Sequence, residues 1–132
     1  MKVLALDYGL ARTGVAVSDP TGTVARPLGV VERAASDEGL GRLATLARAE
    51  RVDRVVVGLP VTLRGGVGAQ AKETVRFVEL LRGAIDVPVE TFDERFTTRL
   101  AQASPGTRAG EDARAAAHLL ETYLEWLSAR TT

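Results

Sequence analysis

The sequence predicts one α/β domain, over residues 1–132, with a mixed five-stranded sheet and helices on both of its faces. Three observations predict it. Residues 2–32 contain three short apolar runs separated by turns with glycine, which is the spacing of an antiparallel meander. The remainder alternates helical and strand patterns, which is typical of right-handed crossover connections. A hydrophobic content of 45% supplies enough apolar residues for one core.

The first three strands are expected at residues 2–8, 13–19 and 23–32. They are short runs that contain β-branched residues, which favour strands. Pro27 lies inside the third run and cannot donate a ladder hydrogen bond. The third strand is therefore expected at the edge of the sheet, or bent.

Two helices are expected to alternate with the last two strands. Residues 36–50 follow the N-cap candidate Ser36 and place four apolar residues at helical spacing, Leu40, Leu43, Ala44 and Ala47. Residues 53–60 are a continuous apolar run, typical of a strand buried on both faces. The helix expected at 69–83 ends at Gly83 and directs inward Ala71, Val75, Val78 and either Leu80 or Leu81.

The fifth strand is expected at residues 87–94, and the longest helix at 111–130 after a turn at 104–110. This helix has an apolar side that should lie on the sheet, formed by Ala116, Leu119, Leu120 and Tyr123.

Composition excludes several classes of function. Seventeen basic and seventeen acidic residues cancel, so a polyanion would need a local patch or a bound cation to attract it. The chain has no cysteine, so a metal would need oxygen ligands or the single histidine, His118, which is better explained as structural. No run reaches membrane length and no signal pattern opens the chain, so a cytoplasmic protein without a membrane partner is expected.

Acidic residues end two of the predicted strands. Asp7 closes the first strand, and Asp93 with Glu94 closes the fifth. The carboxyl ends of parallel strands meet at one edge of a sheet, where ligands commonly bind. Asp112 starts the last helix on its apolar side and is expected to join them. Taken singly, Asp7 is explained as a turn cap and Asp112 as a favourable charge at a helix start.

Three acids at one edge would repel one another unless a cation lay between them. Oxygen ligands of this kind suit Mg²⁺ or Mn²⁺. Two such ions about 3.5–4 Å apart activate water and stabilise a leaving oxygen in phosphodiester hydrolysis. The acids therefore predict a two-metal site at this edge.

Five blocks in order resemble the YqgF/RuvX family, which is described as pre-16S rRNA nucleases and as Holliday-junction-resolvase-like proteins with an RNase H-like fold. The blocks are LALDYGLARTGVAVSD, ARPL, VVVGLP with GAQAKETVRFVELL after it, FDERFTT, and DARAAAHLLETYL.

The resemblance implies that Asp7 is the catalytic acid of the first strand and Asp112 that of the last helix. The second acid comes from Asp93 or Glu94. Side chains alternate along a strand, so at most one of these two points directly into the site. We favour Glu94, which makes Asp7, Glu94 and Asp112 the expected metal ligands.

Five further residues are candidates for contact with the substrate. Arg95 could hold a phosphate, or form only a structural ion pair with its acidic neighbours. Arg64 lies in a glycine-rich loop, and Arg12 precedes the second strand. Gly9 leaves room for a backbone phosphate beside Asp7. Tyr8 could stack on a base, although a core position is the better explanation.

The resemblance implies a metal-dependent nuclease that leaves a 5′-phosphate, with the 5′ end of pre-16S rRNA as its substrate. A Holliday junction resolvase acting on branched DNA is the first alternative. A non-catalytic RNA-binding factor for ribosome assembly is the second, and the three acids argue against it because they would repel RNA. An ATP-dependent phosphotransferase would need two such domains. Whether the chain forms a homodimer stays open.

Overall fold

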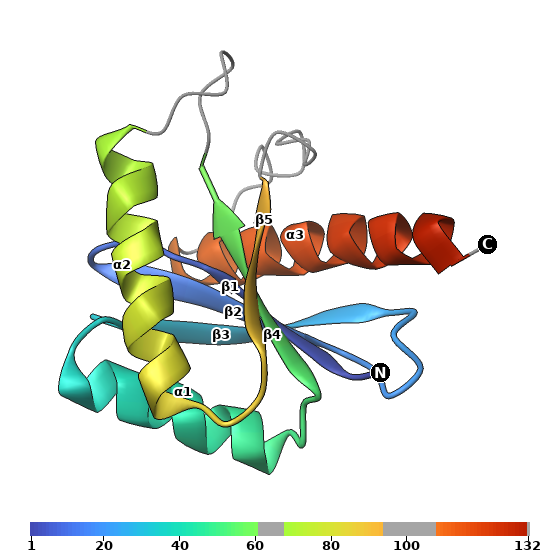
Figure 1. Ribbon diagram of the computed structural model, residues 1–132, viewed down its shortest axis with the longest axis horizontal. Helices are drawn as coiled ribbons and strands as arrows, with labels where there is room; N and C mark the ends of the chain where they lie inside the picture. Colours follow the sequence, from blue (N-terminus) through green and yellow to red (C-terminus); the bar gives the residue numbers. More distant parts are fainter. Residues whose placement is uncertain (61–67, 94–107, 132) are drawn as a thin grey trace.

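The computed structural model describes residues 1–60, 68–93 and 108–131. Its described ranges contain a five-stranded sheet and three helices in the predicted order (Figure 1). The strands are β1 (Val3–Asp7), β2 (Arg12–Ser18), β3 (Ala25–Glu32), β4 (Arg54–Leu59) and β5 (Val89–Asp93). The helices are α1 (Asp37–Ala49), α2 (Ala69–Ala84) and α3 (Arg108–Thr131).

The sheet has the order β3-β2-β1-β4-β5, with β1 at its centre. Strand β2 pairs antiparallel with both β1 and β3. Strand β4 pairs parallel with both β1 and β5. The prediction of a mixed sheet with an antiparallel start and parallel crossovers is confirmed. The carboxyl ends of β1, β4 and β5 lie at the same edge, which we call the upper edge.

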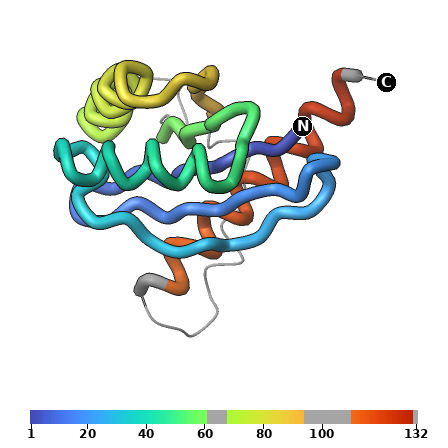
Figure 2. The backbone as a smooth tube through the Cα atoms, turned by 90° about the horizontal axis from the view of Figure 1, so that it is seen from below, coloured from blue at the N-terminus to red at the C-terminus, as the bar shows by residue number. Residues whose placement is uncertain are grey.

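Helices cover both faces of the sheet. Figure 2 shows α1 and α2 on one side of the strands and α3 on the other. Alternation along β1 divides the core accordingly: Leu4 and Leu6 pack in the cluster under α1 and α2, whereas Val3 and Ala5 pack under α3. Odd-numbered positions of β1 therefore face α3.

Several local predictions are confirmed. Ser36 caps α1, and its hydroxyl accepts a hydrogen bond from the backbone N–H of Gly39 at 3.0 Å. Strand β3, which carries Pro27, is an edge strand, and its register with β2 shifts between Val15 and Ala16. The sequence signals for the cap and for the edge were both local, which explains why they could be identified.

Other predictions were wrong in detail. Val75, which was predicted to face inward, is 43% exposed, whereas Thr74 and Phe77 are buried in the face that α2 presents to the sheet. Of the alternatives Leu80 and Leu81, Leu81 is the buried one. The helix continues through Gly83 to Ala84, because a glycine in a helix is tolerated when the adjacent turn, here at Leu81, is buried. Helix α3 begins at Arg108, three residues before the predicted start.

No helix of the described residues is long and apolar enough to span a membrane.

Tyr123 fixes the middle of α3 to the sheet. Its side chain is 1% exposed, and its hydroxyl donates to Glu90 of β5 and accepts from Arg54 of β4 at 2.8 Å. Arg54 also donates to Glu90 at 3.1 Å. The ring packs edge-on against Phe92, with centroids 5.4 Å apart. This network joins α3 to two parallel strands and so sets the position of the helix over the sheet.

The Tyr123 network predicts a loss of stability at alkaline pH. Burial, followed by the hydrogen bond to Glu90, raises the pKa of Tyr123 from 10.0 to about 12. The folded state thus favours the neutral phenol. The stabilisation that the protonated Tyr123 hydroxyl provides is therefore complete below pH 10 and is lost as pH rises through 12. We expect the free energy of unfolding to fall by roughly 2 kcal/mol by pH 11.5 for this reason.

Urea unfolding between pH 9 and 11.5 measures how the free energy of unfolding depends on pH. Tyr123→Phe is the control because phenylalanine does not titrate. The wild-type curve should fall more steeply with pH than that of the variant. Parallel curves would show that the phenol does not titrate abnormally.

Candidate active site

Asp7 lies at the end of β1, at the upper edge of the sheet. It is half-buried and stands directly across from Gly14 of β2. Because Val3 and Ala5 face α3, alternation places Asp7 on the α3 side as well. The charge that ends this apolar strand is therefore directed toward the start of α3.

Gly14 brings α3 into direct backbone contact with the sheet at this point. A Cβ atom built on Gly14 would lie 1.9 Å from the carbonyl oxygen of Asp112 and 3.2 Å from the nitrogen of Ala113. The helix backbone approaches this closely only because position 14 has no side chain. Asp7 and Asp112 consequently lie next to the same residue, Gly14. Gly14 was not among the predicted site residues, although a glycine inside a strand is a recognisable signal for close approach.

Asp112 is held at this edge by an ion pair. The Nε atom of Arg12 donates to its Oδ2 atom at 2.8 Å. The two side chains are 35% and 30% exposed, so the pair lies at the border between core and solvent. The expectation that α3 carries Asp112 inward agrees with this geometry. Arg12, predicted as a substrate contact, here contacts an acid of the site.

Asp93 ends β5 beside Leu59 of β4, at the same edge. Its neighbour Phe92 packs under α3, 5.6 Å from Trp126 between ring centroids. Alternation therefore places Asp93 on the opposite face of the sheet from Phe92 and from Asp7. Glu94, Arg95 and Arg64, which were predicted as site residues, lie outside the described residues. Within the described ranges, no three acidic or histidine side chains are grouped closely enough to hold a metal ion.

The turn after β1 is tight because of Gly9. Its Cβ would lie 2.5 Å from the carbonyl oxygen of Arg12, and its N–H points to the hydroxyl of Thr13 at 3.4 Å. Tyr8, in the same turn, stacks on Phe77 of α2 with ring centroids 4.3 Å apart. Burial, together with the charge of Glu73, raises the pKa of Tyr8. The ring thus belongs to the core beside the site.

Arg114, two residues after Asp112 on α3, was not among the predicted site residues. Its Nε and Nη2 atoms are buried, and the described structure gives them no hydrogen-bond partner. These two atoms form one edge of the guanidinium group, which fits two oxygens of a carboxylate or phosphate. Nothing in the pattern of α3 distinguishes this arginine from a solvated one.

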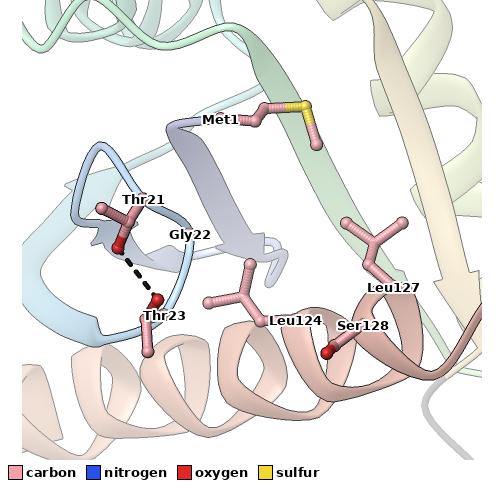
Figure 3. Close-up of a pocket in the computed structure, with 7 residues that line it drawn as sticks. All are labelled: Met1, Thr21, Gly22, Thr23, Leu124, Leu127 and Ser128. Carbon is pink, nitrogen blue, oxygen red and sulfur yellow. Dashed lines mark hydrogen bonds between the residues drawn. The ribbon is translucent and has the colours of Figure 1, made fainter. Parts of the chain in front are cut away.

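A separate pocket of about 330 Å³ lies near the amino terminus, between the β2–β3 hairpin and the second half of α3 (Figure 3). Its described lining consists of Met1, Thr21, Gly22, Thr23, Leu124, Leu127 and Ser128. Met1 precedes β1, so this pocket lies at the end of the strand opposite to Asp7. None of these lining residues has a carboxylate side chain, and the acids of the candidate site are elsewhere.

Asp7 and Asp112 are the predicted site acids that the structure places beside Gly14 at the upper edge. Carboxylate oxygens are the ligands that Mg²⁺ and Mn²⁺ prefer. Asp7 stands across from Gly14 in the sheet, and the backbone of Asp112 rests on Gly14. In this structure Arg12 forms an ion pair with Asp112. The donor set fits a hard divalent ion, and these two acids could hold it.

Two solved structures share the fold. Thermus thermophilus RuvC, solved in complex with a Holliday junction substrate, aligns with a TM-score of 0.61 over 100% of this chain and 98% of that one, at 19% identity. The fowlpox virus Holliday junction resolvase aligns with a TM-score of 0.53 over 96% of this chain and 99% of that one, at 12% identity. These likenesses confirm the predicted fold class.

Two curated relatives are more similar in sequence to this chain than these two solved structures are. A protein of Rubrobacter xylanophilus is 47% identical over 94% of this chain and 92% of its own length. One of Desulforamulus reducens is 36% identical over 95% of this chain and 97% of its own. Both are named "Putative pre-16S rRNA nuclease".

The model of the RuvX family, described as Holliday junction resolvase, matches residues 1–126. The resemblance seen in the five sequence blocks is thereby confirmed, as is the assignment to a nuclease family. The chain belongs to the RuvX family.

Proposed function

We propose that this protein is a metal-dependent nuclease that hydrolyses phosphodiester bonds, and that the 5′ end of pre-16S rRNA is its substrate. One observation carries the proposal: α3 rests on Gly14 so that Asp112 lies beside Asp7 at the upper edge. The names of the curated relatives support the choice of pre-16S rRNA.

Asp7, Glu94 and Asp112 are the proposed metal ligands. Phe92 faces α3, so continued alternation along the chain favours Glu94 over Asp93 as the acid on the side of Asp7. A bound Mg²⁺ or Mn²⁺ would lower the pKa of a bound water and stabilise charge on the phosphate. The three acids would hold and orient the cation.

The same arrangement accounts for binding of a polyanion by a chain with zero formal net charge. A divalent cation reverses the local charge at the acids, so a phosphate can approach them. Gly9 follows Asp7 and Tyr8 in a compact turn, in which it lies close to the backbone carbonyl of Arg12. Arg64 and Arg95 are proposed to contact neighbouring phosphates, because a guanidinium group matches phosphate oxygens.

A Holliday junction resolvase is the second candidate, favoured by the description of the family model. The same acids would perform the same chemistry on branched DNA. Recognition of the substrate, rather than the reaction, separates the two functions.

Cleavage assays separate them directly. We propose to compare end-labelled pre-16S rRNA fragments, unstructured single-stranded RNA and a four-way DNA junction, each with Mg²⁺ or Mn²⁺. We expect the pre-16S fragment to be cut fastest, at its 5′ side. Faster cleavage of the junction would favour the resolvase. Asp112→Asn is the control for the site, and undiminished cleavage by this variant would overturn the assignment of Asp112.

A further inference from the structure

The ion pair between Arg12 and Asp112 occupies a carboxylate that the proposed function assigns to a metal. We infer that Arg12 is the counter-ion of Asp112 in the metal-free protein, and that it competes with the divalent cation for this carboxylate. The inference rests on the proposed function, because it needs a cation at Asp112. It gives Arg12 a role in tuning metal affinity beyond contact with the substrate.

The geometry favours Asp112 as the partner of Arg12. Glu32 stands directly across from Arg12 on β3 and is exposed. The guanidinium nevertheless bonds Asp112, on a helix 100 positions away in the sequence, at 2.8 Å. Arg12 is the first residue of β2, two positions before Gly14, so its backbone is fixed beside the contact with α3.

Charge explains why this partner matters. Asp7 and Asp112 lie next to one residue, and without a cation their charges repel. A single positive charge on Arg12 reduces this repulsion. A divalent ion that binds these acids is repelled by the positive charge of Arg12. It also competes with Arg12 for the Oδ2 atom of Asp112. Arg12 must therefore lower the affinity of the site for metal while it stabilises the site without metal.

Because Arg12 and Asp112 are both partly exposed, a divalent ion can replace Arg12 at the Asp112 carboxylate. With Arg12 35% exposed and Asp112 30% exposed, water solvates either group when the pair separates. Ion pairs of this kind contribute little net free energy, so a divalent ion can displace the arginine. A purely structural pair has a different consequence: its removal would loosen the start of α3, and metal affinity would then fall or stay unchanged.

The test is the affinity for Mn²⁺ alone, measured by electron paramagnetic resonance of the free ion at low salt. We expect Arg12→Ala to bind Mn²⁺ about fivefold more tightly than the wild type, on the scale of a partly exposed ion pair. We expect Arg12→Lys, which keeps the charge, to bind like the wild type. The rise in melting temperature on addition of Mn²⁺ should be larger for Arg12→Ala.

Arg42→Ala is the matched control. Arg42 forms an ion pair of the same length, 2.8 Å, with Glu38 on the surface of α1. The substitution removes the same charge away from the site, so Mn²⁺ affinity should not change.

Two kinds of failure are distinguishable. Unchanged or weaker Mn²⁺ binding by Arg12→Ala, while the wild type binds in a manner abolished by Asp7→Asn, would overturn this inference alone. Absence of Mn²⁺ binding by the wild type, or binding that Asp7→Asn leaves intact, would overturn the proposed metal site and this inference with it. If Arg12→Ala does not fold, Arg12→Gln replaces it, since glutamine keeps part of the side-chain stem without the charge.

Discussion

Gly14→Ala is expected to lower the free energy of unfolding by about 3 kcal/mol, the upper range for overpacking. The new Cβ would lie 1.9 Å from the carbonyl oxygen of Asp112. That atom belongs to the helix backbone and cannot rotate away, so α3 must move off the sheet. The movement displaces Asp112 from Asp7, and we expect cleavage to fall together with stability.

Urea unfolding at pH 7 measures the first effect, and Gly41→Ala is the matched control. Nothing lies within 4 Å of a Cβ at Gly41. Alanine is the better helix former, so this variant should be more stable than the wild type by about 1 kcal/mol. Equal stability of the two alanine variants would mean that α3 does not rest on Gly14.

Asp7→Asn is expected to reduce the rate of cleavage by at least about 10²-fold, the scale of losing one group that stabilises a transition state electrostatically. The amide keeps the size of the carboxylate, but it removes the negative charge that holds a cation. Because the amide fills the same space, packing at position 7 is kept. The variant should therefore fold about as stably as the wild type.

Single-turnover cleavage and thermal unfolding, measured on the same preparations, separate the two effects. Lost activity with an unchanged melting temperature supports a role in the reaction. A melting temperature well below that of the wild type would instead identify Asp7 as a structural cap of the turn.

Most of the fold could be predicted from the sequence because its signals are local. The apolar run at β4 predicted a strand buried on both faces, and Val55, Val56 and Val57 are fully buried. The spacing of Leu119, Leu120 and Tyr123 predicted the face of α3 that packs on the sheet. For α2, spacing alone could not distinguish Val75 from Phe77, because both are apolar and the tertiary fit decides between them.

The site could be predicted only in part. Asp7 was proposed because it ends an apolar strand, and Asp112 because it lies on the apolar side of the last helix; their roles as metal ligands stay predictions. The contact of Gly14 with Asp112 and the ion pair of Asp112 with Arg12 join residues about 100 positions apart, so no local pattern encodes them. The unpartnered guanidinium edge of Arg114 likewise depends on what surrounds it in three dimensions. That Asp93 and Glu94 lie on opposite faces stays a prediction, because Glu94 lies outside the described residues.

The requirement of the wild-type protein for a divalent cation tests the central claim most directly. The measurement is the single-turnover rate of cleavage of a labelled pre-16S rRNA fragment, first with EDTA and then with increasing Mn²⁺. The account predicts no cleavage in EDTA and a saturable recovery as Mn²⁺ is added. Cleavage in EDTA at the rate seen with Mn²⁺ would contradict it.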